Sequence, residues 1–229
     1  MTAPVPELVD RLRRFDTSTI SDACQRSGSE CHVVTGIAPL TAAVLVAGAV
    51  VTVQLGPAAD SSGRSTRHLG TAAVEAATSD NVIMIDHQGR ADCAGWGGNL
   101  SRGARQRGCA GTIIDGAARD IDEASAIGYP VFGRGSTPIS ARGRAVELSC
   151  QTTIEFAGVR VRPGDFVIAD STGVVIIPQQ VITDVLDAAA GIAAQEEAIV
   201  RRINDGTPIS EAMGRDYERM LQGDGADAD

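Results

Sequence analysis

The chain has 229 residues, a formal net charge of −9 and 43% hydrophobic residues, which is enough to bury a full core in one compact domain. No apolar run approaches the roughly 20 residues that cross a bilayer, and an acidic chain with 3% aromatic residues lacks the basic, ring-bearing surface of nucleic-acid binders, so we expect neither a membrane nor a nucleic-acid partner. All 20 basic residues are arginine, which excludes a lysine Schiff base and a phosphate-binding loop that ends in Gly-Lys.

The N-terminal part of the sequence predicts helices followed by strands. Residues 6–15 have the apolar spacing of an amphipathic helix, and Thr17 or Ser18 can cap a second helix that ends near Gly28. The Val-rich segment 43–55 then predicts one or two buried strands.

The next part of the chain alternates loops with regular elements. We expect a polar surface loop, a short helix, a buried strand and a second loop, at 56–67, 69–77, 81–86 and 87–94. In or beside the first loop, Arg64, Arg67 and His68 are candidates to contact an anion, and solvated charges are the alternative interpretation.

The stretch 95–123 predicts a turn, a helix, a strand, a turn and a further helix. A glycine-rich turn opens a helix over 99–107, and an apolar strand follows over 111–115, after which Gly116 is expected to turn the chain. This alternation of helices and strands is typical of a parallel or mixed sheet covered by helices.

An arginine and an aspartate, Arg119 and Asp120, come directly after this strand and turn. Open α/β sheets bind ligands beyond the carboxyl ends of their strands, so we expect the pair to lie near the glycine-rich turn. Free N–H groups at a helix start favour an anion, and the pair adds a cationic fork and a carboxylate. The combination suits a small carboxylate substrate held beside a hard metal ion.

Other residues of this stretch have structural interpretations. Asp120 could instead begin a capping box, in which it would accept a hydrogen bond from the backbone N–H of Glu123. Trp96 is expected to pack under the glycine-rich turn. Cys93 and Cys109 are expected to be inert, because no flanking histidine is evident to activate them.

The C-terminal half is expected to be rich in β-strands. Short apolar strands over 145–177 are separated by Gly, Pro and Asp turn residues, which predicts hairpins, and a long helix follows over 179–204. We therefore predict a single domain over 1–205. The remaining segment, 206–229, is expected to be an extension that is partly disordered or packs on a neighbouring subunit.

The number and spacing of the cysteines indicate the redox state of the cellular compartment. Five cysteines at irregular spacings argue against a disulfide framework and for the reducing cytoplasm, and no pair has the CxxC spacing of a zinc site. The N-terminus lacks a basic region followed by an apolar core, so no signal peptide is expected. We predict a cytoplasmic location.

Several motifs together resemble the RraA-like family, whose best-known branches are regulator of ribonuclease activity A and the divalent-metal-dependent 4-hydroxy-4-methyl-2-oxoglutarate aldolases. The motifs are TSTISDA, WGGNL, GTIIDGAARDIDE, YPVFGRG and VRPGDFVIADSTGVVIIP, and the resemblance covers roughly residues 15 to 205. It implies an α/β fold, namely an α/β/β swivelling-domain sandwich with a mixed central sheet and a long C-terminal helix. It also implies a homotrimer or hexamer with sites between subunits.

The resemblance assigns roles to the central stretch. In the aldolase branch, the arginine before the aspartate binds the substrate carboxylate and the aspartate ligates Mg²⁺ or Mn²⁺, which implies these roles for Arg119 and Asp120. Backbone amides of the turn hold the pyruvyl group, and the matching residues here are Gly98, Asn99 and Leu100.

Further acidic residues are implied around the metal. An acid from a neighbour's C-terminal helix approaches the ion through water, and Glu196 or Glu197 matches it. The chain departs from the aldolases at Gly98, where they carry an acid that positions water for proton transfer. Asp92 is the candidate to replace that acid.

Two alternative functions follow from the resemblance. One is a metal-dependent lyase that acts on short 2-oxo acids, by aldol cleavage or by decarboxylation of oxaloacetate, with Mg²⁺ or Mn²⁺ as cofactor. The other is a non-catalytic regulator that binds a ribonuclease or another protein. Metal and pyruvyl binding are expected to be intact, whereas the glycine at position 98 favours decarboxylation over aldol cleavage.

Overall fold

The computed structural model describes residues 3–42, 44–60 and 67–214. The helices among them are α1 (Val5–Leu12), α2 (Thr17–Arg26), the short 3-10 helix η1 (Ala58–Asp60), α3 (Thr71–Ala76), α4 (Gly98–Gln106), α5 (Ile121–Ala126), α6 (Ile182–Asn204) and α7 (Ile209–Ala212). The strands are β1 (His32–Val34), β2 (Ala38–Pro39), β3 (Val46–Pro57), β4 (Asn81–Trp96), β5 (Gly111–Ala118), β6 (Val131–Gly133), β7 (Gly135–Ser136), β8 (Ala145–Cys150), β9 (Ile154–Phe156), β10 (Val159–Val161), β11 (Phe166–Ala169) and β12 (Val174–Ile177).

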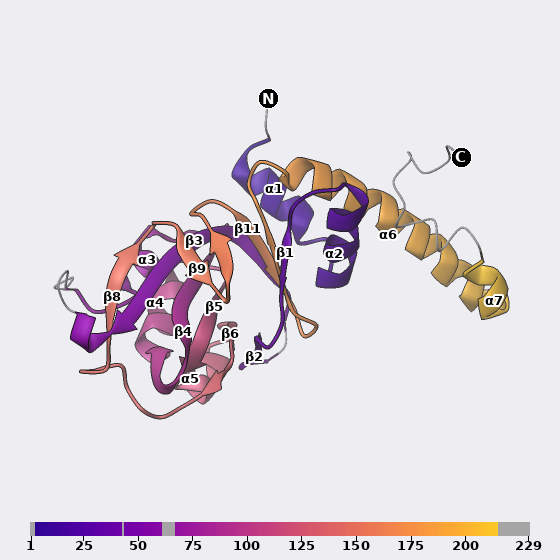
Figure 1. Cartoon of the computed structure of the whole chain (residues 1–229). Coiled ribbons are helices and arrows are strands. Elements are labelled where there is room, and N and C mark those ends of the chain that lie inside the picture. The colour runs from indigo at the N-terminus through magenta and orange to yellow at the C-terminus, as the bar shows by residue number, and fades with distance from the viewer. Residues whose placement is uncertain (1–2, 43, 61–66, 215–229) are drawn as a thin grey trace.

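The strands form a mixed sheet in the order β1-β12-β11-β3-β4-β5-β6-β2 (Figure 1). Its centre is parallel, since β3 pairs with β4, β4 with β5 and β5 with β6 in the same direction. The strands β11, β12 and β1 continue the sheet in antiparallel pairs. In addition, β7 pairs with β5 and β8 pairs with β3, while β9 and β10 form a separate hairpin. The parallel centre places the ends of β4 and β5 at one edge.

The two faces of the sheet are covered by different layers. Because side chains of a strand alternate, Val51 and Val53 of β3 pack with α3, α4 and α5, whereas Val50 packs with the β9–β10 hairpin. The helices α1, α2 and α6 form a further cluster with β3, β11 and β12, apart from α3–α5 (Figure 1). This arrangement of helices, mixed sheet and hairpin confirms the predicted α/β/β sandwich with a long C-terminal helix.

The segment 87–94 is not the simple loop that the sequence predicted. β4 continues to Trp96, but its pairing with β5 shifts register after Asp86 and again after Arg90, so that the intervening residues bulge out. Gly116 likewise lies within β5 rather than at a turn, and a Cβ there would meet the ring of His87 at 2.8 Å. The glycine is therefore required for the close approach of the buried bulge.

The start of α2 also differs from the prediction. Asp16 caps the helix, accepting a hydrogen bond from the backbone N–H of Thr19 at 2.7 Å. Thr17 instead donates its N–H and its hydroxyl to Asp170, in the turn between β11 and β12. The residue that the sequence favoured as a cap thus ties α2 to the sheet.

The long helix α6 is buried mainly along its first half, and its end is contacted by α7, where Arg202 donates to the carbonyls of Glu211 and Ala212. Its buried residues end at Ile192, whereas Val200 and Ile203 are exposed, and the helix runs away from the sheet toward α7 (Figure 1). The described part of the 206–229 segment contains α7, and residues 215–229 lie outside the description. None of the described helices is both long and apolar enough to cross a membrane.

Candidate active site

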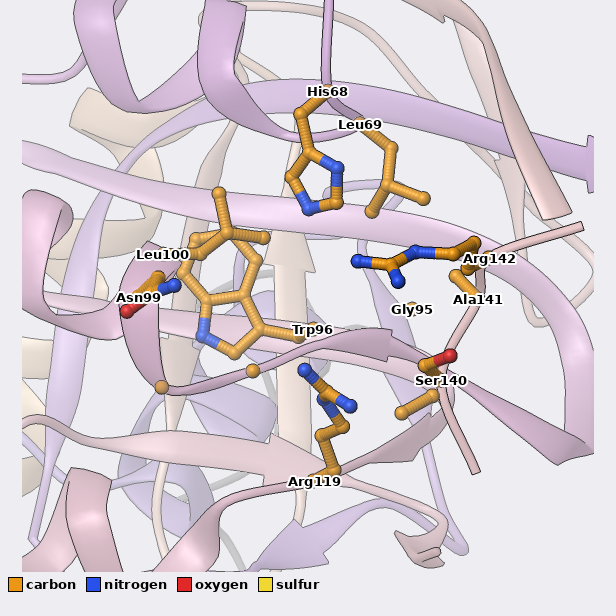
Figure 2. A pocket seen from close by; sticks show the side chains of 13 residues that line it. His68, Leu69, Gly95, Trp96, Asn99, Leu100, Arg119, Ser140, Ala141 and Arg142 are labelled. Atoms are coloured by element: carbon orange, nitrogen blue, oxygen red, sulfur yellow. The ribbon is translucent and has the colours of Figure 1, made fainter. Parts of the chain in front are cut away.

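A pocket of about 100 Å³ lies at the carboxyl ends of the parallel strands β4 and β5. It is lined by the segments 68–69, 94–100 and 140–142 together with Arg119 (Figure 2). The glycine-rich turn between β4 and α4 forms one wall, and Arg119 enters from the residue after β5. The pocket therefore brings together the turn and the arginine that the sequence singled out.

The first turn of α4 presents two backbone N–H groups without internal partners. Gly97 precedes the helix, and the first intrahelical bond runs from the N–H of Ser101 to the Gly97 carbonyl at 3.0 Å. Within the described chain, no acceptor lies opposite the N–H groups of Asn99 and Leu100, and both residues line the pocket. Such free donors at a helix start favour an anion.

Asp120 closes the edge of the pocket. Its carboxylate accepts a hydrogen bond from the Gly98 N–H at 2.9 Å and lies 3.3 Å from Nε of Arg119, with the two side chains 37% and 41% exposed. The backbone N–H of Arg119 donates to the Trp96 carbonyl at 3.0 Å, which fixes the pair beside the turn. Of the three predicted amides, that of Gly98 is therefore occupied by the aspartate.

The capping box that competed for Asp120 is not formed. Asp120 precedes α5, but its backbone is left-handed, with φ 57° and ψ 39°, and its side chain makes no capping hydrogen bond. Aspartate tolerates this conformation better than most residues, yet the conformation still costs energy. The strained backbone points the carboxylate at the start of α4 instead of at its own helix.

Glu123 lies where a side chain at position 98 would begin. A Cβ on Gly98 would be 2.3 Å from Oε2 of Glu123, so the glutamate carboxylate fills that space. Oε1 of Glu123 also accepts from Nε of Arg102 at 2.5 Å. From the sequence, Glu123 was expected only as part of the capping box at the start of a helix. Its proximity to Gly98 arises from the packing of α5 against α4, which no local pattern predicts.

The other acidic candidates lie elsewhere in the chain. Asp92 is exposed and paired with Arg90 at 2.7 Å, and it does not line the pocket. Glu196 is on α6, where burial and then the nearby Asp16 and Asp22 raise its pKa. Glu197 forms an ion pair with Arg201 at 3.5 Å on the same helix. A contact from α6 to this pocket would have to come from another copy of the chain.

Two expectations about neighbouring residues have clear outcomes. Trp96 does pack under the turn: it is buried, donates Nε1–H to the Ser101 hydroxyl at 2.9 Å and stacks on Tyr129. The reason given for an inert Cys93 was wrong, since Nε2 of His87 lies 3.7 Å from its sulfur. Burial nevertheless raises the pKa of the Cys93 thiol and lowers the pKa of His87, which disfavours a thiolate–imidazolium pair.

The carboxylate of Asp120 suits a hard cation that takes few protein ligands. Among the described residues, no cluster of three His, Cys, Asp or Glu side chains is arranged to hold a metal ion. Mg²⁺ usually keeps several waters and takes only one or two carboxylates. Oδ2 of Asp120 is engaged by Gly98 and Arg119, and its other oxygen is the one left for a cation.

A comparison with protein families shows where the chain belongs. Residues 17–176 match the family model described as "RraA-like: Aldolase/RraA". The chain therefore belongs to the RraA-like family, as the motifs in its sequence predicted. The matched region spans α2 to β12 and includes the whole pocket.

Individual relatives carry different names. The chain is 33% identical over 199 residues to a Halalkalibacterium halodurans protein named "Putative 4-hydroxy-4-methyl-2-oxoglutarate aldolase", covering 87% of this chain and 90% of that protein. It is 30% identical over 213 residues to Protein DlpA of Legionella pneumophila. The aligned residues cover 93% of this chain but only 34% of DlpA, so the chain spans about a third of the length of DlpA.

A solved structure supports the same fold. Streptomyces coelicolor RraAS2, described as an unusual member of the RNase ES inhibitor RraA protein family, has a TM-score of 0.75 and 25% identity to this chain. The likeness covers 86% of this chain and 97% of RraAS2. Relatives of this chain thus include proteins named for an aldolase and a protein named for a ribonuclease inhibitor.

Proposed function

We propose that the chain is a divalent-metal-dependent carbon–carbon lyase that acts on short 2-oxo acids. The observation that carries this proposal is the convergence of Arg119, Asp120 and the free N–H groups of Asn99 and Leu100 on one pocket edge. The same arrangement would serve the aldol cleavage of 4-hydroxy-4-methyl-2-oxoglutarate and the decarboxylation of oxaloacetate, since both reactions leave the enolate of pyruvate.

Asp120 is the residue that would hold the metal, which we take to be Mg²⁺ or Mn²⁺. Its carboxylate is half-exposed and fixed in direction by the Gly98 N–H, which fits an oxygen ligand that leaves most coordination positions to water. When bound, such an ion supplies a Lewis acid that draws electron density from the 2-oxo group. Glu123 brings a further carboxylate to the same turn, next to Gly98.

The chain's own groups would bind and orient the substrate. Arg119 offers a planar cationic fork for the carboxylate next to the 2-oxo group, and the N–H groups of Asn99 and Leu100 add donors backed by the helix dipole. As the carbon–carbon bond breaks, its electron pair moves into the 2-oxo group and negative charge grows there. Donors already fixed in place stabilise such charge without reorganisation.

Glu123 is proposed to supply the acid that is absent from position 98. Its carboxylate occupies the space above Gly98, the position at which the resembled aldolases carry an acid, and Arg102 holds its other oxygen. A carboxylate there could hold the water that takes the proton of the 4-hydroxyl group as the carbon–carbon bond breaks, and a proton is then returned to the enolate carbon to give pyruvate. This arrangement supports aldol cleavage as well as decarboxylation, so the preference for decarboxylation inferred from Gly98 alone no longer follows.

A homotrimer or a hexamer in a reducing cytoplasm completes the proposal. Glu196 and Glu197 lie on α6, whose far half carries the exposed Val200 and Ile203, and an assembly would cover this half. Among the described residues all five cysteines are free thiols, which is consistent with a reducing compartment. Sedimentation of the full chain tests the assembly. The Glu196→Gln and Glu197→Gln variants test whether a neighbour's glutamate approaches Asp120.

The proposal is tested by measuring pyruvate release from both substrates, with Mg²⁺ and with a chelator. We expect turnover that requires the metal and that is lost in Asp120→Ala, while the melting temperature falls by no more than about 4 °C. Full activity in Asp120→Ala, or turnover that ignores the chelator, would refute the lyase assignment.

The second candidate is a non-catalytic regulator that binds a ribonuclease. The observations that favour it are the likeness to RraAS2 and the exposed apolar side chains of Val200 and Ile203 on α6. Co-purification with an RNase E-type ribonuclease, retained in Asp120→Ala and lost when Val200 and Ile203 are changed to Asp, would support this alternative. A metal-dependent release of pyruvate with no such binding would exclude it.

A further inference from the structure

Two guanidinium groups enter the same pocket from different parts of the chain. Arg119 rises from the end of β5, and Arg142 enters from the loop between β7 and β8, so that both point toward the space in front of Trp96 (Figure 2). Arg119 faces Asp120. The guanidinium of Arg142 makes no hydrogen bond or ion pair with any of the described residues, although it lines the pocket.

The backbone that carries Arg142 is fixed in place. Residue Ser140 bridges Ala94 of β4, whose N–H donates to the Ile139 carbonyl at 2.9 Å. The next residue, Ala141, is buried, and its carbonyl accepts from the N–H of Arg144 at 2.8 Å. The backbone that carries Arg142 is therefore anchored beside the pocket, whereas its exposed side chain has no protein partner among the described residues.

The opposite rim is built in a similar way. The N–H of Gly70 donates to the buried carboxylate of Glu147 at 2.7 Å, and the Thr71 hydroxyl donates to the His68 carbonyl at 2.7 Å. These bonds fix the backbone beside His68, whose exposed ring lies at the pocket on the side away from Arg119 (Figure 2). Glu147 thus acts as a positioning residue for the rim.

The lining of the pocket is unbalanced in charge. It contains two arginines and one histidine, and no aspartate or glutamate is among its described lining residues. Asp120 can offset only Arg119, from the pocket edge. An unpaired arginine beside a half-enclosed apolar wall such as Trp96 and Leu100 favours a second anionic group on whatever fills the pocket.

We infer that Arg142, with His68, forms a second anion subsite that selects 2-oxo acids carrying a carboxylate at the far end from the 2-oxo group. Arg119 and the amides of α4 would bind the carboxylate next to the 2-oxo group, and Arg142 would bind the distal one. This inference rests on the proposed lyase function for the 2-oxo acid, but the subsite itself requires only a dicarboxylate.

The subsite can be tested without turnover, because Trp96 is the single tryptophan of the chain and lines the pocket. Succinate and butyrate have the same length and differ only in the second carboxylate, so they are titrated against the full chain in Mg²⁺ by tryptophan fluorescence and by calorimetry. We expect succinate to bind roughly tenfold more tightly than butyrate, as one charge-assisted contact provides.

Two variants separate the subsite from general electrostatics. Arg142→Gln should remove the preference for succinate and leave butyrate binding unchanged. Arg105→Gln is the matched control, since it makes the same charge change on the exposed end of α4, outside the pocket. A succinate preference that survives Arg142→Gln, or that falls equally in both variants, would overturn the inference, as would the absence of any preference in the unmodified chain.

Kinetics with oxaloacetate distinguishes the subsite from the chemistry. Because the distal carboxylate of oxaloacetate leaves as CO2, a guanidinium that grips it stabilises bound substrate more than the transition state. Arg142→Gln should therefore raise KM about tenfold without lowering kcat. A selective fall in kcat would contradict the distal assignment. A chain that prefers succinate through Arg142 but releases no pyruvate would keep the subsite and refute the lyase.

Discussion

Two Arg–Asp pairs lie at β5, and they differ in the exposure of the aspartate and in how many protein groups contact it. Asp115, within β5, is only 6% exposed; one of its oxygens pairs with Arg134 and the other accepts from the Ala157 N–H at 3.1 Å. Asp120, two residues beyond the strand, is 37% exposed and shares its pocket edge with Arg119 and free backbone donors. Both oxygens of Asp115 have protein partners. Beside Asp120, by contrast, the backbone N–H groups at the start of α4 have no acceptor among the described residues.

The contrast separates a structural role for one pair from the binding role that we propose for the other. Asp115 faces the β9–β10 hairpin, on the face of the sheet opposite to the pocket, and its contacts hold that hairpin to the sheet. Asp120 uses one oxygen to accept from the start of α4, and its second oxygen has no partner among the described residues. An Arg–Asp pair is thus a functional candidate only where its partners are incomplete.

The largest expected effect separates the two arginines. Arg119→Gln removes the cationic fork from the pocket and should lower kcat/KM for pyruvate release about 100-fold or more, with the melting temperature unchanged. Arg134→Gln, which alters the structural pair, should lower the melting temperature and leave kcat/KM of the folded enzyme intact. Equal losses of kcat/KM in the two variants would remove the distinction between the pairs.

The second effect concerns stability at the structural pair. Asp115→Ala leaves the Ala157 N–H and the partly exposed Arg134 without their acceptor, so the free energy of unfolding should fall by about 2 kcal/mol, as measured by urea denaturation. The corresponding change at the exposed carboxylate, Asp120→Ala, should cost less than about 1 kcal/mol, since exposed pairs contribute little. If the two costs prove equal, the exposed pair is structural as well.

A smaller effect tests whether Glu123 completes the exposed pair's site. Glu123→Ala should slow aldol cleavage roughly 100-fold, as the loss of a proton-transfer group does. Adding Gly98→Asp to that variant should restore part of the rate, because the space next to position 98 is then free. Gly98→Ala alone places a Cβ 2.3 Å from the Glu123 carboxylate and should impair the enzyme, whereas the same change should be tolerated in Glu123→Ala. An unchanged rate in Glu123→Ala would refute the role.

The smallest effect comes from Asp170, which accepts from the N–H of Thr17 at the start of α2, much as Asp120 does at α4. Burial alone would raise the pKa of Asp170, but hydrogen bonds from Thr17 and Thr172 outweigh it and lower the pKa below its usual value. A lowered pKa stabilises the fold above about pH 4, and this contribution is lost as the pH falls through the folded-state pKa.

Asp170→Asn should therefore reduce the free energy of unfolding by about 1 kcal/mol near pH 7. The difference from the unmodified chain should shrink as the pH falls below about 4, where the native carboxylate also becomes protonated. Denaturation curves measured between these pH values check the sign. A cost that grows toward acid pH would show that Asp170 is not held as a carboxylate.

The sequence predicted the layers of the fold because the periodicity of its apolar residues is strong. The strands of 145–177 and the long helix α6 appear as expected, since alternating Val and Ile residues and turn glycines encode them locally. The bulge at 87–94 could not be predicted in this way, because it depends on His87 being buried against Gly116 of the neighbouring strand.

The site was predictable in part for a similar reason. Asn99, Arg119 and Asp120 were identified from a glycine-rich turn and from an arginine–aspartate sequence, both of which are local signals. Arg142 carried no signal, since only the pairing of Ser140 with Ala94 brings it to the pocket. Glu123 was interpreted as a helix-start residue because its proximity to Gly98 depends on how α5 packs against α4.

The most direct test of the central claim is the Mg²⁺ dependence of pyruvate release from oxaloacetate in three matched proteins: the unmodified chain, Asp120→Asn and Asp115→Asn. We expect the unmodified chain and Asp115→Asn to release no pyruvate in chelator and to recover fully as Mg²⁺ is added, whereas Asp120→Asn should not respond. If Asp120→Asn responds to Mg²⁺ as the unmodified chain does, or if none of the three requires the metal, the exposed Arg–Asp pair is not a metal-assisted active site.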